Sequence, residues 1–393
     1  MKSKLIHPLV ILNGPTVAIL LLALTSFFVD PVNTYVRKRI TEFPLLSLSV
    51  TAVGITSLNV GYLLGKKEKI IAAISLGYLA FILYRVSCTI STTEFLMCIL
   101  GVLSVIAYFS MITEKKAYVE TAMMAVGFIL SVAGLFLREE PISGVAVGIT
   151  ALFLSYPFIF KSFRKRGLLF TLLYILGVLP YKFRADILMI IAMYVVLMFL
   201  ENNKIGGLKL FLCGLIAIAI IVFMGYLKTP YSRLNPFTLL LYREGLFLYY
   251  LEKTCRESVP LGYGVSIWST REHPTWILGK ELFKVEKGIT TGLFGPLVFD
   301  GGILEVIVAS LVVGGVLKSY YSRRDKYFER CAYSILAAMV VIAGEVGFNT
   351  IEIVCINIMV LSRVIRDLKV VKEARDEFNR LLELGFLMEG LKA

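Results

Sequence analysis

Apolar residues occur along this chain in runs of about 15 to 23 residues, divided by short clusters of Lys, Arg and Glu. A helix of about 20 apolar residues crosses the roughly 30 Å hydrocarbon core of a bilayer. The pattern therefore predicts an all-α, polytopic membrane protein with about 12 transmembrane helices. The predicted spans are residues 8–29, 43–64, 70–86, 93–112, 119–137, 142–160, 167–181, 185–201, 206–227, 295–317, 331–348 and 349–365.

One long polar segment, residues 228–294, interrupts this pattern. It divides the chain into nine spans within residues 1–227, a loop, three spans within residues 295–365 and a tail, residues 366–393. The tail has apolar residues at three- and four-residue spacings among charges, which predicts an amphipathic helix on the inner membrane surface. We find no internal repeat that would divide the chain further.

Composition supports the membrane class. Hydrophobic residues make up 58% of the 393 residues and charged residues only 18%, whereas soluble domains average about 25% charged residues. The net charge of +13 would suggest nucleic acid in a soluble protein, but basic residues also gather at the cytoplasmic ends of membrane helices. We therefore predict no nucleic-acid partner. The basic clusters at 66–69, 115–116, 161–166 and 323–326 predict that both termini are cytoplasmic and that the long loop is external.

The long loop is the best place for a functional site. A connection of this length is uncommon unless it is functional or disordered, and the strongly apolar stretch Leu239–Leu251 argues against disorder. We expect that stretch to form a helix docked on the membrane face, within a loop that contains short helices. The loop also carries both tryptophans, Trp268 and Trp276, and His273, one of only two histidines.

The six cysteines show no spacing typical of a metal site, and we predict neither a metal nor a cofactor. By the predicted topology, only Cys88 and Cys255 fall in external segments, so a disulfide between these two residues is the one pairing to test.

The order of motifs in the loop resembles a family. Arg243 heads the loop helix, and Val259–Gly264 reads Val-Pro-Leu-Gly-Tyr-Gly. The small-residue segment Gly288–Gly295 and then Phe299-Asp-Gly-Gly302 lead into the next span. This order resembles the O-antigen polymerases, the related O-antigen ligases and similar oligosaccharide repeat-unit polymerases of prokaryotes. Ligases usually place a His before the helix that follows the loop, and Thr290-Thr291 at this point is more similar to the polymerases.

The resemblance implies a glycosyltransferase of the prokaryotic cytoplasmic membrane. The donor would be a polyprenyl-diphosphate-linked oligosaccharide, and membrane lipid and other glycan-assembly membrane proteins would be its partners. A metal-independent enzyme needs fixed cations for the diphosphate leaving group, which arginine supplies. The catalytic candidates are Arg243, Arg271 and His273, and the base is either His273 or a loop carboxylate such as Glu272. The substrate-binding candidates are Arg256, Lys280, Glu272, Trp268, Trp276, Thr290, Thr291 and Asp300. We expect Asp300 to orient a loop arginine or cap a helix rather than act as a nucleophile.

Three alternatives stay open. A lipid-linked oligosaccharide flippase or another carrier would concentrate polar residues at the bilayer midplane, with short loops. An archaeosortase-like transpeptidase would need a catalytic cysteine, for which Cys255-Arg256 is the only suggestive pair. The chain would also serve as a non-catalytic assembly protein if none of the loop residues reacts.

Overall fold

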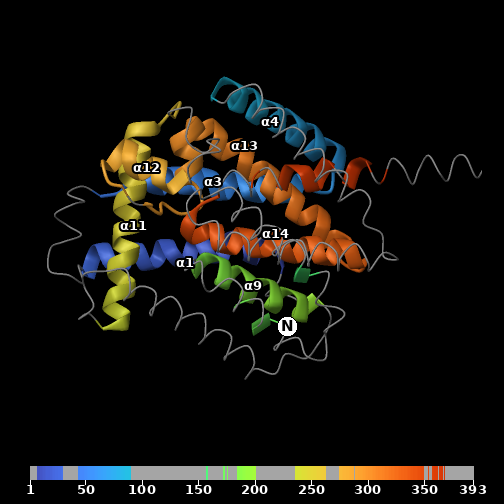
Figure 1. Ribbon diagram of the computed structural model, residues 1–393, viewed down its shortest axis with the longest axis horizontal. Coiled ribbons are helices and arrows are strands. Elements are labelled where there is room, and N and C mark those ends of the chain that lie inside the picture. The colour runs from blue at the N-terminus through green and yellow to red at the C-terminus, as the bar shows by residue number, and fades with distance from the viewer. Residues whose placement is uncertain are drawn as a thin grey trace, which may run out of the picture.

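A bundle of long helices, crossed at one end by a further helix, forms the computed structural model of this protein (Figure 1). All regular secondary structure in its described residues is α-helical, which confirms the all-α part of the predicted fold class. The structure describes residues 7–29, 43–89, 156–157, 171–172, 175, 184–200, 235–262, 274–286, 288–348, 353, 356–361, 363–365 and 367. Apart from isolated positions, the predicted spans between 93 and 181, the span 206–227 and the tail lie outside the described residues.

Six helices of the bundle coincide with predicted spans within a few residues. They are α1 (Pro8–Val29), α3 (Leu45–Leu64), α4 (Glu68–Thr89), α9 (Arg184–Leu200), α13 (Gly295–Ser322) and α14 (Tyr327–Val346). Residues 356–361 and 363–365 are also helical and lie within the last predicted span. Of the described helices, α1, α3 and α13 are long and apolar enough to cross a membrane. The multi-pass membrane class is therefore supported, while the number of spans and their orientation stay predictions.

Helix α13 packs most extensively on α3. Glycines make this possible, because a Cβ atom on Gly314 would overlap the carbonyl oxygen of Leu58 and one on Gly61 would overlap that of Leu311. Lipid is as apolar as the side chains, so membrane helices associate largely by close packing at small residues. The α3–α13 pair forms the centre of the described bundle, with α4, α11 and α14 also packed against α13.

Helix α11 (Pro236–Ser258) crosses the ends of the bundle helices, and α12 (Pro274–Phe283) lies beside it (Figure 1). Both lie within the predicted loop segment, where α12 is a short helix of 10 residues and α11 is longer, with 23 residues; that the segment is external stays a prediction. Helix α11 begins where Asn235 accepts a hydrogen bond from the backbone N–H of Thr238 at 2.8 Å and Pro236 occupies the first turn. Both features favour a helix start. We call the end of the bundle crossed by α11 the loop end.

Glu252 connects α11 to the bundle. Its Oε2 accepts a hydrogen bond of 2.8 Å from the backbone N–H of Ser47, in the first turn of α3. A carboxylate in this position satisfies a backbone donor that has no partner inside the helix, and it interacts favourably with the helix dipole. Glu252 is almost fully buried, so this contact fixes α11 over the start of α3.

Candidate active site

The site begins at a break in α13. Gly301 and Gly302 have non-helical backbone angles, and Gly302 adopts φ 65° and ψ −152°, a conformation that other residues rarely adopt. The turn that follows α11 packs directly on this break. The backbone N–H of Ile303 donates to the carbonyl oxygen of Pro260 at 3.2 Å, and a Cβ atom on Gly262 would overlap the carbonyl oxygen of Asp300. The Pro-Leu-Gly turn and the Asp-Gly-Gly segment are therefore in contact.

A buried ion pair lies at this junction. The side chain of Asp300 is fully buried, and its Oδ1 lies 3.3 Å from Nη2 of Arg85, near the end of α4. Arg85 keeps about a fifth of its side-chain surface exposed and lies 5.5 Å from the centre of the Phe81 ring. A charged pair inside apolar helices is costly unless the partners are held together, so this pair is a functional candidate.

A second polar pair lies deeper on the same two helices. The hydroxyl of Tyr78 donates to Oε1 of Glu305 at 2.9 Å, and both side chains are buried. Tyr78 and Arg85 are seven residues apart, two helical turns, and therefore lie on one face of α4. Helix α4 thus presents a hydroxyl and a guanidinium to two carboxylates of α13.

The candidates on α11 lie in different surroundings. Arg243 is half-buried and next to the buried Glu244. Arg256 is exposed, and its Nε donates to Oε1 of Glu252 at 2.9 Å, so it is attached to the carboxylate that caps α3. Substrate binding by Arg256 would therefore involve a guanidinium that already has one carboxylate partner.

The remaining described candidates lie on α12 and in the segment before α13. Lys280 and Trp276 are exposed on α12, which packs over the junction through Leu278, Leu282 and Phe299. Thr290 is half-buried and Thr291 is fully buried. Trp268, Arg271, Glu272 and His273 lie outside the described residues, so their positions stay predictions.

Thr291 lies beside a small cavity between α1, α3, α11 and α14. Its Oγ1 has no hydrogen-bond partner among the described residues, although it is inaccessible to solvent. The cavity is lined by Thr16, Leu20, Thr51, Phe247, Leu251, Thr291, Leu293, Phe294 and Gly344. A buried hydroxyl is stable only with a hydrogen-bond partner, so Thr291 is a position to test by substitution.

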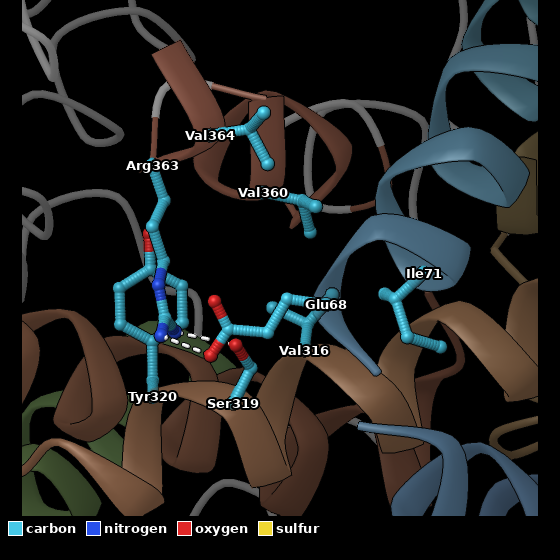
Figure 2. A pocket seen from close by; sticks show the side chains of 8 residues that line it. All are labelled: Glu68, Ile71, Val316, Ser319, Tyr320, Val360, Arg363 and Val364. Atoms are coloured by element: carbon cyan, nitrogen blue, oxygen red, sulfur yellow. Dashed lines mark hydrogen bonds and ion pairs between the residues drawn. The ribbon is translucent and has the colours of Figure 1, made fainter. Parts of the chain in front are cut away.

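A second hollow lies at the opposite end of the bundle (Figure 2). The guanidinium of Arg363 points into it, pairs with Glu68 at 2.6 Å and donates to the hydroxyl of Ser319. Arg323 also pairs with Glu68, at 3.0 Å, and with Asp367, at 2.9 Å. This network joins three helical segments, and its charges are balanced by two carboxylates and two guanidinium groups.

The cysteine alternative finds no support. Cys88 and Cys255 are both free thiols, so the disulfide considered from the sequence does not form. Cys255 is fully buried. Burial and, to a lesser extent, the nearby Glu252 carboxylate raise the pKa of the Cys255 thiol well above its ordinary value. Because the thiolate is the nucleophile, this environment does not suit a catalytic cysteine.

Among the described residues, no group of three or more His, Cys, Asp or Glu side chains gathers as metal ligands would.

Sequence reasoning did not place Arg85 and Tyr78 in the site. Glu305 was noticeable only as a charged residue in an apolar run, the type of signal that marks functional groups in membrane helices. Arg85 gives the same signal near the end of its span. Asp300 was expected to orient a loop arginine or cap a helix; its described ion-pair partner, Arg85, belongs to α4 and not to the loop, so that role stays a prediction.

An all-helical membrane protein with a polar junction under two loop helices is the class that these features define. A family model described as putative O-antigen polymerase matches residues 145–357, more than half of the 393 residues. The chain therefore belongs to the putative O-antigen polymerase family, as the loop motifs predict.

Similarity to individual proteins covers less of the chain. An uncharacterized protein of Methanocaldococcus jannaschii is 31% identical over 142 residues, which is 34% of this chain and 35% of that relative. The chain thus matches about a third of the length of this curated relative. No solved structure matches.

Proposed function

We propose that this protein is a membrane glycosyltransferase that joins polyprenyl-diphosphate-linked oligosaccharide units into a longer glycan. The reaction would take place at the outer face of the cytoplasmic membrane, and the loop end would face outward. Membership of the O-antigen polymerase family supports the activity. The observation that carries the proposal is that the two loop motifs meet at the buried Arg85–Asp300 pair, beneath α12.

The proposed reaction is a displacement at the anomeric carbon of the donor glycan. An acceptor sugar hydroxyl loses its proton and forms the new C–O bond, while the bond to the diphosphate breaks and its electron pair leaves with the diphosphate. Negative charge develops on that leaving group, and fixed guanidinium groups stabilise such charge where water is excluded. We assign this task to Arg243 and Arg271, with Arg256 and Lys280 binding the donor. His273 or Glu272 would accept the proton from the hydroxyl.

The Arg85–Asp300 pair has a positioning role in this proposal. Asp300 precedes the break in α13 that receives the turn after α11, and Arg85 attaches it to α4. A rigid junction of this kind would hold α11, and with it Arg243, at a constant distance from the donor. A fixed geometry accounts for much of the rate of such reactions.

One observation favours the transporter alternative. The Tyr78–Glu305 pair is buried within two apolar helices, and polar groups at that depth also occur in carriers of lipid-linked glycans. The loop end nevertheless contains the family motifs, so we place glycan polymerisation first.

The proposal is tested in a source strain that lacks the gene and is complemented by variants. Arg243→Ala and Arg271→Ala should each reduce long-chain glycan by about 100-fold or more, because each removes a fixed cation from the leaving group. Arg→Lys should restore little activity, because lysine lacks the planar, two-pronged donor. Lys69→Ala, an exposed cation at the opposite end, is the matched control. Membrane insertion is checked by quantifying the protein in the membrane fraction.

Glycan of normal length in both arginine variants would overturn the proposal. The two functions also differ in where unpolymerised units accumulate. A polymerase defect leaves single lipid-linked units at the outer face, where a membrane-impermeant oxidant such as periodate destroys them. A transporter defect leaves them at the inner face, protected from the oxidant.

A further inference from the structure

Five side chains form a basic cluster at the end of the bundle opposite α11. They come from the start of α1, the end of α3 and the end of α13, and they are His7, Tyr62, Lys318, Tyr321 and Arg324. The Tyr62 hydroxyl is the centre of the cluster, because Nζ of Lys318 and Nε2 of His7 each lie 3.2 Å from it. Arg324 stacks 4.1 Å from the centre of the Tyr321 ring, and the His7 ring meets the edge of the same tyrosine.

The positive charge of this cluster is not balanced within the described part of the chain. Among the described residues, no carboxylate pairs with Lys318, Arg324 or His7. The neighbouring Arg323 shows the contrast, because it pairs with both Glu68 and Asp367. The two consecutive arginines therefore have different surroundings in the part of the chain that the structure describes: Arg323 is paired with two carboxylates, whereas Arg324 lies near the two further bases Lys318 and His7.

The charges are also held in a defined geometry. Tyr62 and Tyr321 are buried, so the aromatic part of the cluster is fixed, while His7, Lys318 and Arg324 are each partly exposed. Burial, followed by the charges of Lys318 and Arg324, lowers the pKa of His7 below its ordinary value. After burial, the charges of Lys318 and Arg324 contribute to the lower pKa of His7, and an anion bound among these three side chains would raise it.

We infer that the His7–Lys318–Arg324 cluster binds a phosphate group, and that this phosphate belongs to the headgroup of an anionic phospholipid in the adjacent leaflet. Unpaired bases at the end of a span often act only as general membrane anchors. Here Lys318 and His7 both contact the Tyr62 hydroxyl, and Arg324 lies over the ring of Tyr321, which His7 also contacts, so the three basic side chains gather around two tyrosines. A headgroup is favoured over free phosphate because the cluster surrounds the first residues of α1, at the start of a membrane span.

The test uses the full chain in lipid nanodiscs and the titration of His7 by NMR of labelled histidine. The chain has only two histidines, so His7→Gln assigns the signal. The nanodiscs contain either phosphatidylcholine alone or phosphatidylcholine with phosphatidylglycerol. We expect phosphatidylglycerol to raise the pKa of His7 by about one unit or more, as an anion within hydrogen-bonding distance does.

Matched variants separate a site from the diffuse surface potential of the bilayer. Lys318→Gln with Arg324→Gln should lose most of the lipid-dependent shift, whereas Lys66→Gln, an exposed lysine at the same end, should retain it. If the double variant does not fold, Arg324→Gln alone provides the same comparison with about half the effect. A third arm adds inorganic phosphate to nanodiscs of phosphatidylcholine, where we expect no shift.

An equal lipid-dependent shift in the wild type and the Lys318/Arg324 variants would overturn the inference, because it would come from surface potential only. A full shift with inorganic phosphate alone would overturn the assignment to a lipid. Loss of the shift in the Lys66→Gln control would overturn the location of the site.

Discussion

Replacement of Gly302 by Ala tests the junction on which the proposed site depends. Gly302 lies at the break in α13, two residues after Asp300, and the turn around Pro260 packs against its Cα. The structure predicts that a single added methyl group separates these two segments.

Two costs add to give the expected magnitude. The backbone angles of Gly302, φ 65° and ψ −152°, are essentially restricted to glycine, and a side chain there costs about 1–3 kcal/mol. The added Cβ would also overlap the carbonyl oxygen of Pro260 and lie 2.8 Å from the backbone nitrogen of Leu261. Backbone atoms cannot rotate away as a side chain can, so one segment must shift, at a further cost of about 1–3 kcal/mol. We expect Gly302→Ala to destabilise the protein by about 2–6 kcal/mol.

The assay is denaturant unfolding of the full chain in detergent micelles, with glycan length in the complemented strain as a second measurement. Gly77→Ala is the control, because Gly77 lies in the regular helix α4 and a Cβ atom there would meet nothing within 4 Å. That change should be neutral or stabilise the chain by up to about 1 kcal/mol. If Gly302→Ala unfolds at the same denaturant concentration as Gly77→Ala, the close approach of the turn to α13 is refuted.

Two further predictions concern buried polar groups near the site. Thr291→Val removes a hydroxyl that has no partner in the described residues, so the free energy of unfolding should stay the same or rise by about 1 kcal/mol. A loss of glycan length without a loss of stability would support the predicted role of Thr291 in binding. A large destabilisation would contradict its burial without a partner. In variants that keep a single cysteine, a maleimide at pH 7 should label exposed Cys88 readily and Cys255 only after unfolding. The reason is that the raised pKa of Cys255 leaves almost no thiolate. Rapid labelling of Cys255 in the folded protein would restore the transpeptidase alternative.

The bundle helices could be predicted well from the sequence because their boundaries are set by where apolar runs meet charge. Residues 8–29 were expected to form a span, and α1 has those bounds. The predicted span 295–317 ends before Lys318, whereas α13 continues to Ser322. The helix continues past Lys318 because this side chain is held against the protein. Its Nζ hydrogen-bonds to the Tyr62 hydroxyl and lies over the same ring. The charge of Lys318 therefore marks the end of the apolar run in the sequence but not the end of helix α13.

The loop helix shows what local signals add. The apolar stretch 239–251 predicted a helix, and α11 is longer, from Pro236 to Ser258. Its start could have been read from Asn235-Pro236, a cap followed by a residue suited to the first turn. Its end could not, because the charged last turns are stabilised by contacts with distant groups, such as that of Glu252 with the start of α3.

The set of residues that make up the site could be predicted least well from the sequence. Asp300 was expected to orient a loop arginine or cap a helix, but its described ion-pair partner is Arg85 of α4, which is 215 residues away in the chain. Hydropathy does not reveal which faces of two apolar helices meet, because helices in a bilayer are apolar all round. Pairs of this kind can be recognised only when the packing of α4 against α13 is known.

The contribution of α4 also bears on where the function lies in the chain. The family match covers residues 145–357, and it includes Asp300 and Glu305 but neither Arg85 nor Tyr78. A protein reduced to the matched residues would keep two buried carboxylates while losing a guanidinium and a hydroxyl that contact them. It would also lose α3, the helix that packs most closely on α13. A buried carboxylate that loses its cation is strongly destabilising, by about 3–5 kcal/mol in known cases. The family-defining segment therefore depends on the helices that precede it, and the proposed site is a property of both parts of the chain.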